Sequence, residues 1–252
     1  FLLEQARAQG VAFDKFATGH YARTRFDEAS GRWQLLRGKD AGKDQSYFLS
    51  RLKQAQLSGL IFPLGELRKG EVKEIARKLG WSDLAEKDES QDFIECEDYS
   101  VLFRPGDAKP GDFVSRAGKV LGQHRGILHY TIGQRKGLAL GGGGTPWYVL
   151  EIDAARNRVV VGPQEDLYAR ELEAGDLNWV ALAGPPEKPL RCSVQIRQRH
   201  RAAAATVCAA AGGRMKVVFD ESQLAVTPGQ TAVFYDGDVV LASGAIEKPP
   251  QI

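Results

Sequence analysis

Apolar and polar residues follow a helical spacing in the first part of the chain and a two-residue spacing after about residue 103. The clearest helix is predicted over 69–79, with Gly80 as its C-cap. Its apolar positions lie on one face and should pack: Val72, Ile75, Ala76 and Leu79. A helix is also predicted over 1–9, a strand end over 16–21 and a short strand over 33–36.

The later part of the chain reads as short strands separated by turns. Hairpins are predicted over 112–120, with an Ala117-Gly118 turn, and over 147–161. The following strands are predicted over 176–182, 190–199, 203–209, 214–219, 224–226, 231–235 and 238–246. This density of strands and turns indicates a small barrel or sandwich, with a boundary between two β units near 163–175.

Length and composition are those of an ordinary globular protein. The 252 residues are enough for one large domain or two to three small ones, and 43% of them are hydrophobic. No apolar run is long enough to span a bilayer, and no stretch resembles a signal peptide. Three cysteines without a CxxC pair predict neither a disulfide scaffold nor a metal site. We therefore expect a cytoplasmic protein without a membrane partner.

The net charge of +2 is unevenly distributed. Residues 83–98 contain eight acidic side chains and one lysine, a net charge of −7. Residues 103–138 contain seven basic and two acidic side chains (+5), and residues 187–201 contain five basic and one acidic (+4). Two basic stretches suit a surface that meets a polyanion, although ordinary surface charge is an equally good explanation.

Three polar stretches could carry the function. Residues 39–45 place Lys39, Asp40, Lys43, Asp44 and Gln45 directly before an apolar helix. Such a loop suits a polar or anionic ligand, or it is a solvated connection in which Asp44 caps the helix.

The other two stretches are basic. Residues 195–201 should place Gln195, Arg197, Arg199 and Arg201 along one strand face as a phosphate track. Residues 126–138 interleave aromatic and basic side chains, which suits RNA contacts or a solvated turn.

The cysteines differ in their surroundings. Cys192 and Cys208 lie in predicted strands and read as core thiols. Cys96 lies in a polar loop, where a thiol could be reached. The acidic neighbours of Cys96 should raise its pKa, which opposes formation of a reactive thiolate. His20 follows a predicted strand end, where open α/β sheets bind ligands, although a lone histidine is more often structural.

Six motifs in one order give a family resemblance. They are ATGHYAR (17–23), GKDQSYFL (42–49), FPLGELRKGEV (62–72), ESQDF (89–93), HYTIGQRKGL (129–138) and AVTPGQTAVFY (225–235). Together they resemble the tRNA-specific 2-thiouridylases, also called tRNA-uridine 2-sulfurtransferases. The resemblance covers essentially the whole chain.

This resemblance implies a fold and an activity. The expected fold class is α+β: residues 1–100 as the C-terminal part of a PP-loop α/β catalytic domain, 101–168 as a small β-rich domain, and 169–252 as a β-barrel. The expected activity is 2-thiolation of the wobble uridine in tRNAs for Lys, Glu and Gln. ATP (with Mg²⁺) adenylates the base, and a cysteine persulfide loaded by a sulfur-relay protein or cysteine desulfurase delivers the sulfur.

The resemblance also assigns residues. Gly19 matches an ATP-contacting glycine. The expected tRNA contacts are His20, Lys43, Asp44, Gln45, Arg197, Gln198 and Gln230.

Three differences from the family matter. The chain begins after the phosphate loop and first catalytic cysteine of the family, so we expect it to be inactive alone and to supply mainly tRNA binding. Ile94 stands where the persulfide cysteine is usual, with Cys96 two residues later as its possible substitute. Gln198 replaces a tyrosine, which removes a stacking surface.

Two alternatives remain open. The chain could be a non-catalytic RNA-binding relative that has lost its sulfur-transfer cysteine. A methyltransferase is disfavoured, because no glycine-rich strand–loop–helix suited to S-adenosylmethionine is present.

Overall fold

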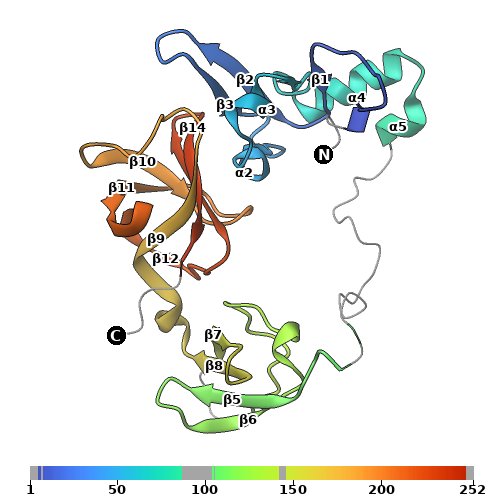
Figure 1. Cartoon of the computed structure of the whole chain (residues 1–252). Helices are drawn as coiled ribbons and strands as arrows, with labels where there is room; N and C mark the ends of the chain where they lie inside the picture. Colours follow the sequence, from blue (N-terminus) through green and yellow to red (C-terminus); the bar gives the residue numbers. More distant parts are fainter. Residues whose placement is uncertain (1–4, 7, 87–103, 105, 142–145, 248–252) are drawn as a thin grey trace. The chain divides into compact units, whose positions relative to one another are not determined.

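A computed structural model describes residues 5–6, 8–86, 104, 106–141 and 146–247 (Figure 1). The chain forms two compact units. The first unit contains Phe1–Asp88, Glu171–Glu221 and Pro228–Ile252, and the second contains Glu89–Arg170 and Ser222–Thr227.

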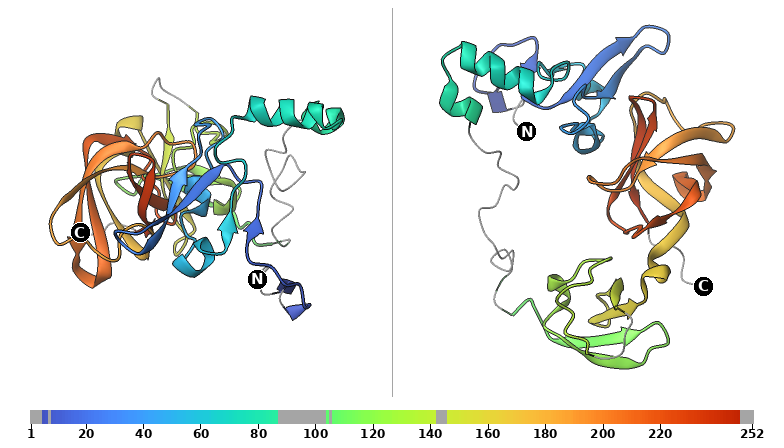
Figure 2. Two further views of the ribbon diagram at one scale, coloured as in Figure 1. Left: turned by 90° about the horizontal axis from the view of Figure 1, so that it is seen from above. Right: turned by 180° about the vertical axis from the view of Figure 1, so that it is seen from behind.

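The first unit contains a closed six-stranded barrel. Its strands pair in the order β13-β10-β11-β12-β9-β14, and an additional β13–β14 pairing closes the ring. The strands, yellow to red in Figure 2, curl around one another in both views. Their bounds are β9 (Tyr168–Trp179), β10 (Leu190–Gln195), β11 (Ala203–Ala210), β12 (Arg214–Leu224), β13 (Thr231–Asp236) and β14 (Val239–Ile246).

Alternate side chains of the barrel strands point inward, as a two-residue spacing requires. Met215, Val217 and Phe219 of β12 are each at most 1% exposed, whereas the residues between them are partly exposed. A 3₁₀ turn, η4 (Ala211–Gly213), links β11 to β12. The prediction of a small β-barrel is therefore confirmed.

The barrel sheet continues into the N-terminal region. Strand β14 also pairs with β3 (Arg32–Arg37), with Val239 opposite Leu36, and β3 pairs with β2 (Ala22–Asp27). The sequence did not predict β2, because ARTRFD is largely polar and suits an exposed edge strand. This continuous sheet brings the segment after β3 against one end of the barrel.

The remaining N-terminal elements are short. Strands β1 (Phe16–Ala17) and β4 (Leu60–Ile61) pair in parallel, as expected for an α/β domain. The helices are α2 (Ser46–Leu49), α3 (Gln54–Leu57), α4 (Lys69–Lys78) and α5 (Ser82–Glu86). Of the helix predicted over 1–9, the described residues 5, 6 and 8 are helical.

Helix α4 begins at the predicted residue and ends one residue earlier than predicted, so Leu79 and not Gly80 is its C-cap. Gly80 follows Leu79 and adopts φ +79°. The helix has no buried residue, and Ile75 and Leu79 are 45% and 57% exposed. The expected packing is therefore confirmed in part for Val72 and Ala76, which are partly buried, and wrong for Ile75 and Leu79, which face solvent.

The second unit is a four-stranded sheet in the order β6-β5-β8-β7. Its strands are β5 (Gly111–Ser115), β6 (Val120–His124), β7 (Tyr148–Asp153) and β8 (Arg158–Gly162), with 3₁₀ turns η2 (Ile127–His129) and η3 (Gln164–Leu167). Both predicted hairpins are present, and the central β5–β8 pair is parallel. The core is lined by Phe113, Tyr130, Leu138, Val149, Val159 and Val161.

Three predicted strand boundaries are wrong. Strand β9 begins at Tyr168 and not at 176. The strands predicted over 214–219 and 224–226 are one strand, β12. Strand β10 ends at Gln195, so residues 197–199 are not part of it. None of the helices in the described part of the chain is long and apolar enough to cross a bilayer.

His124 is a buried polar residue in the core of the second unit, with 2% of its surface exposed. Its Nδ1 accepts a hydrogen bond from the Gly126 N–H at 3.0 Å, so Nε2 carries the proton toward the Asn157 carbonyl at 3.2 Å. Desolvation lowers the pKa of His124, although Asn157 and Asp112 act in the opposite direction. The folded unit therefore favours the neutral ring.

We predict that the second unit loses stability as the pH falls below about 6.5, the ordinary pKa of histidine. Below that pH the unfolded chain binds a proton that the folded chain excludes, until the lower folded-state pKa is reached. Amide hydrogen exchange of β5–β8 between pH 5 and 8 measures the effect. The His124→Gln variant should lack this component, and an identical pH profile in both proteins would contradict the prediction.

Candidate functional site

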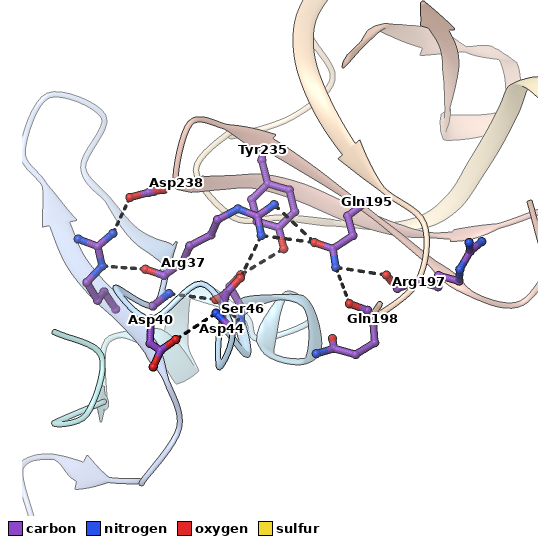
Figure 3. Close-up of polar contacts among 12 residues, drawn as sticks. Arg37, Asp40, Asp44, Ser46, Gln195, Arg197, Gln198, Tyr235 and Asp238 are labelled. Atoms are coloured by element: carbon purple, nitrogen blue, oxygen red, sulfur yellow. Dashed lines mark hydrogen bonds and ion pairs between the residues drawn. The ribbon is translucent and has the colours of Figure 1, made fainter. Parts of the chain in front are cut away.

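The loop after β3 is built around the carboxylate of Asp44 (Figure 3). Oδ1 accepts hydrogen bonds from the backbone N–H groups of Gly38 and Ser46, both at 3.0 Å. Oδ2 accepts from the Ser46 hydroxyl at 2.9 Å and from the Arg37 guanidinium at 3.0 Å. The N-cap of α2 is Gln45, whose side chain makes no cap bond, so the predicted cap residue, Asp44, lies one residue before the cap position. Its bond to Gly38 closes the loop back onto β3. Its side chain is only 8% exposed, and all four contacts are made within the chain.

A glycine is required where the loop begins. A Cβ at Gly38 would lie 2.7 Å from the carbonyl oxygen of Tyr21, which is closer than a real Cβ approaches backbone. The Lys43 N–H then donates to the Asp40 carbonyl at 3.0 Å, which forms a turn that carries the half-buried Lys43. The sequence of small and polar residues therefore specifies a tight, internally bonded loop.

Arg37 connects this loop to the barrel. Its guanidinium lies 3.6 Å from the centroid of the Tyr235 ring, a cation–π contact with strand β13. The same group reaches Gln195 Oε1 at the end of β10, at 3.4 and 3.5 Å. Arg37 therefore contacts the loop through Asp44 and two barrel strands through Tyr235 and Gln195.

The Tyr235 ring beneath the Arg37 guanidinium is fully buried, with no exposed surface. Burial raises the pKa of Tyr235 to about 12, although a hydrogen bond to Ser46 and the charge of Arg37 act to lower it. Its hydroxyl and the Ser46 hydroxyl are 3.2 Å apart. Tyr235 is therefore a neutral hydrogen-bonding group that joins helix α2 to the barrel.

Gln195 holds the basic turn that follows β10. Its Nε2 donates to the carbonyl oxygens of Arg197 and Gln198 at 3.2 and 3.0 Å. The His200 N–H closes the turn on the Arg197 carbonyl at 3.0 Å. The predicted row of guanidiniums on one strand face is therefore wrong. Gln195 is a buried anchor that is 6% exposed, and the arginines are presented by a turn.

Gln230 lies near the same place. It precedes β13, whose first residue, Thr231, accepts a hydrogen bond from the Tyr47 hydroxyl of α2 at 2.9 Å. Burial raises the pKa of Tyr47, whereas the bond to Thr231 and the nearby charge of Arg197 act to lower it. Helix α2, the Arg197 turn and Gln230 are therefore neighbours.

Gln45 links the loop to the segment that contains His20 and Gly19, two of the predicted site residues. Its Oε1 accepts from the Tyr21 N–H, and its own N–H donates to the Tyr21 carbonyl, both at 2.9 Å. His20 precedes Tyr21, and its Nδ1 is 2.9 Å from the Thr18 hydroxyl. Gly19 is exposed in the segment after β1. The structure thus places His20 beside the loop that carries Lys43, Asp44 and Gln45.

A pocket of about 340 Å³ opens beside the loop, lined by Arg23, Arg37, Gly38, Lys39, Ala41, Asp44, Glu66 and Asp238. The three basic and three acidic side chains that line the pocket give it no net charge. Arg23 pairs with Asp238 at 2.7 Å and Glu66 at 3.6 Å, and Arg37 pairs with Asp44.

By contrast, Arg199 and Arg201 are exposed and form no ion pair with any residue that the structure describes. The turn is therefore the stronger candidate for an anion contact.

The described residues do not form a nucleotide site by themselves. Gly19 has open space around it, with only Leu64 within 4 Å of a Cβ built there, so a ligand could approach its backbone. One glycine does not cradle a triphosphate. No cluster of three or more metal-binding side chains occurs in the described part of the chain.

Of the predicted reactive groups, Cys96 lies outside the described residues. Cys192 and Cys208 are free and partly buried. Burial raises the pKa of Cys192 to about 12, so its thiol stays protonated and unreactive at neutral pH. The expectation that Cys192 takes no part in chemistry is consistent with this environment.

Models of three protein-family domains match the chain in succession. They are a tRNA methyl transferase HUP domain over residues 1–96, a tRNA methyl transferase PRC-barrel domain over 100–163 and an aminomethyltransferase beta-barrel domain over 169–246. Similar proteins carry a more specific name. The tRNA-specific 2-thiouridylase MnmA of a Nostoc species is 47% identical over 97% of this chain and 70% of its own length.

The chain belongs to the tRNA-specific 2-thiouridylase family. The MnmA proteins of Moorella thermoacetica and Solibacter usitatus are also 47% identical, over 100% and 95% of this chain and 70% and 67% of their own lengths. The family matches and the closed barrel confirm the expected fold class at the level of a HUP domain followed by two β-rich domains. The exact domain limits stay a prediction.

We predict that Arg37→Met lowers the free energy of unfolding by about 2 kcal/mol, because it leaves the buried Asp44 carboxylate without its counter-charge. The matched control is Arg51→Met. Arg51 pairs with Asp176, but both side chains are more exposed (40% and 79%), so its loss should cost about 0.5 kcal/mol. Urea denaturation compares the two, and equal effects would contradict the role given to Arg37.

Proposed function

We propose that this chain takes part in 2-thiolation of tRNA wobble uridine, and that the residues around helix α2 bind the tRNA. The observation that carries the proposal is the convergence of two separate polar segments. Loop 39–45 and the turn at Arg197–His200 are joined through Arg37 and Gln195, although they are far apart in sequence. His20 and Gln230 lie at the edges of the same region.

The residues divide into two kinds by their contacts. Asp44 and the side-chain oxygen of Gln45 already bond within the chain, so we propose that they position the loop. Lys43, Arg197, Arg199 and Arg201 carry the positive charge that RNA phosphates require. Gln198, His20 and Gln230 are proposed to add hydrogen bonds that orient the RNA.

The chemistry is also a proposal, which family membership supports. ATP, with Mg²⁺, would activate the uridine oxygen for displacement by sulfur, and Gly19 would lie at the nucleotide. We propose that Cys96 carries the transferable sulfur, received from a sulfur-relay protein or a cysteine desulfurase. The expected substrates are tRNAs for Lys, Glu and Gln, and the expected location is the cytoplasm.

We expect tRNA binding by this chain to weaken steeply with salt. Arg199→Gln should reduce the slope of log K against log salt concentration by about one, because each phosphate contact contributes roughly that amount. Lys188→Gln is the control, since Lys188 is exposed near the opposite end of β10 and has the same charge. Binding that does not respond to salt would contradict the proposal.

A second prediction concerns Cys96. Replacing it by serine in the thiolating enzyme should abolish formation of 2-thiouridine and leave the affinity for tRNA unchanged, since only the sulfur carrier is removed. Thiolated tRNA is measured by mass spectrometry of its nucleosides. Undiminished thiolation would exclude Cys96 from the mechanism. An intact protein that binds tRNA but never thiolates it would favour the non-catalytic alternative.

A further inference from the structure

Phe48 is an aromatic side chain that the first unit leaves open to solvent. It is 62% exposed, although its neighbours Ser46, Tyr47 and Ser50 on helix α2 are 0%, 8% and 0% exposed. Exposing a phenylalanine side chain to water costs free energy relative to burying it, so this exposed position suggests a role outside the core. The fold does not require the ring for its core, because Tyr47 fills that position.

The backbone that carries Phe48 is fixed on both sides. Before it, the Ser46 hydroxyl bonds to Asp44 and Tyr235, and the Tyr47 hydroxyl bonds to Thr231. After it, Asn178 Nδ2 donates to the Ser50 carbonyl at 2.9 Å. A ring presented on such a support loses little conformational entropy when a ligand covers it.

Phe48 is linked to the basic turn after β10 through its neighbour Tyr47. Its ring centroid lies 5.9 Å from that of Tyr47, whose hydroxyl is close enough to Arg197 for the two to interact electrostatically. The exposed Arg199 lies in the Arg197–His200 turn, the exposed Arg201 directly follows it, and Ala202 packs against the cluster that contains Tyr47. Exposed aromatic rings used together with guanidiniums are the combination that binds single-stranded nucleic acid.

We propose that Phe48 is a stacking surface for an unpaired RNA base, with the phosphates of the same strand held by the Arg197–His200 turn and the adjacent Arg201. An unpaired base fits better than a protein partner, because a base attached to phosphates offers a flat face to the ring and negative charge to the arginines of the turn. This inference rests on the proposed function, since it names the part of the RNA that the same surface takes. It adds a base contact to a surface otherwise described through polar groups.

The test is an affinity series on this chain with two RNAs. One is a stem-loop with an unpaired loop, and the other is a blunt duplex of equal length. Phe48→Leu keeps an apolar side chain but removes the aromatic face, so it should weaken stem-loop binding about tenfold and leave duplex binding unchanged. Phe48→Trp should restore stem-loop binding. The salt slope should stay as in the wild type, because no phosphate contact is removed.

The control is Phe26→Leu. Phe26 is also exposed, at 48%, and lies on strand β2 against Trp33, so its loss should change neither affinity. Thermal melting checks that all variants fold. Stem-loop binding by Phe48→Leu equal to that of the wild type would overturn this inference alone, as would equal losses on both RNAs. A wild-type chain that binds neither RNA would overturn the proposed function as well.

Discussion

The candidate site depends on the contacts that the Arg37 guanidinium makes with three different segments. One side chain pairs with the Asp44 carboxylate, lies over the Tyr235 ring and reaches Gln195. Each partner holds a different segment: Asp44 closes the loop, Tyr235 anchors helix α2 through Ser46, and Gln195 shapes the basic turn. Arginine suits this position because its planar, permanently charged group can stack and hydrogen-bond at the same time.

This arrangement separates residues that hold the site from residues that are available to a ligand. Asp44 has every oxygen contact made inside the chain, whereas Arg199 and Arg201 extend into solvent from the turn. A carboxylate within a surface proposed to bind RNA would repel phosphates unless its charge were neutralised. The ion pair with Arg37 provides that neutralisation, and it leaves the net positive charge of the turn to act on the RNA.

Sequence alone predicted those features that depend on local patterns or on ordered motifs. The hairpins of the second unit and most barrel strands follow from two-residue alternation and turn residues, and the loop from its density of polar groups. The roles of Arg37 and Tyr235 were not predicted, because their contacts join residues that are distant in the chain. A charged residue directly after the short strand predicted over 33–36 was the available signal, but it does not indicate which residue it contacts.

The wrong predictions for the end of β10 and for the packing of α4 also arose because local sequence patterns do not contain the contacts that decide them. Strand β10 ends at Gln195 because the side chain of Gln195 bonds to the carbonyl groups of the following turn. The spacing of apolar residues does not predict such side-chain bonds. The exposed face of α4 shows that a helical pattern predicts an apolar face but not what covers it.

The central claim is that loop 39–45 and the Arg197–His200 turn act as one RNA-binding surface because Arg37 joins them. A double-mutant cycle on tRNA affinity, with wild type, Arg37→Met, Arg199→Gln and the double variant, tests it most directly. The account predicts that Arg199→Gln weakens binding much less in the Arg37→Met background, with a coupling of about 1 kcal/mol. Additive effects of the two substitutions in a folded protein would contradict it.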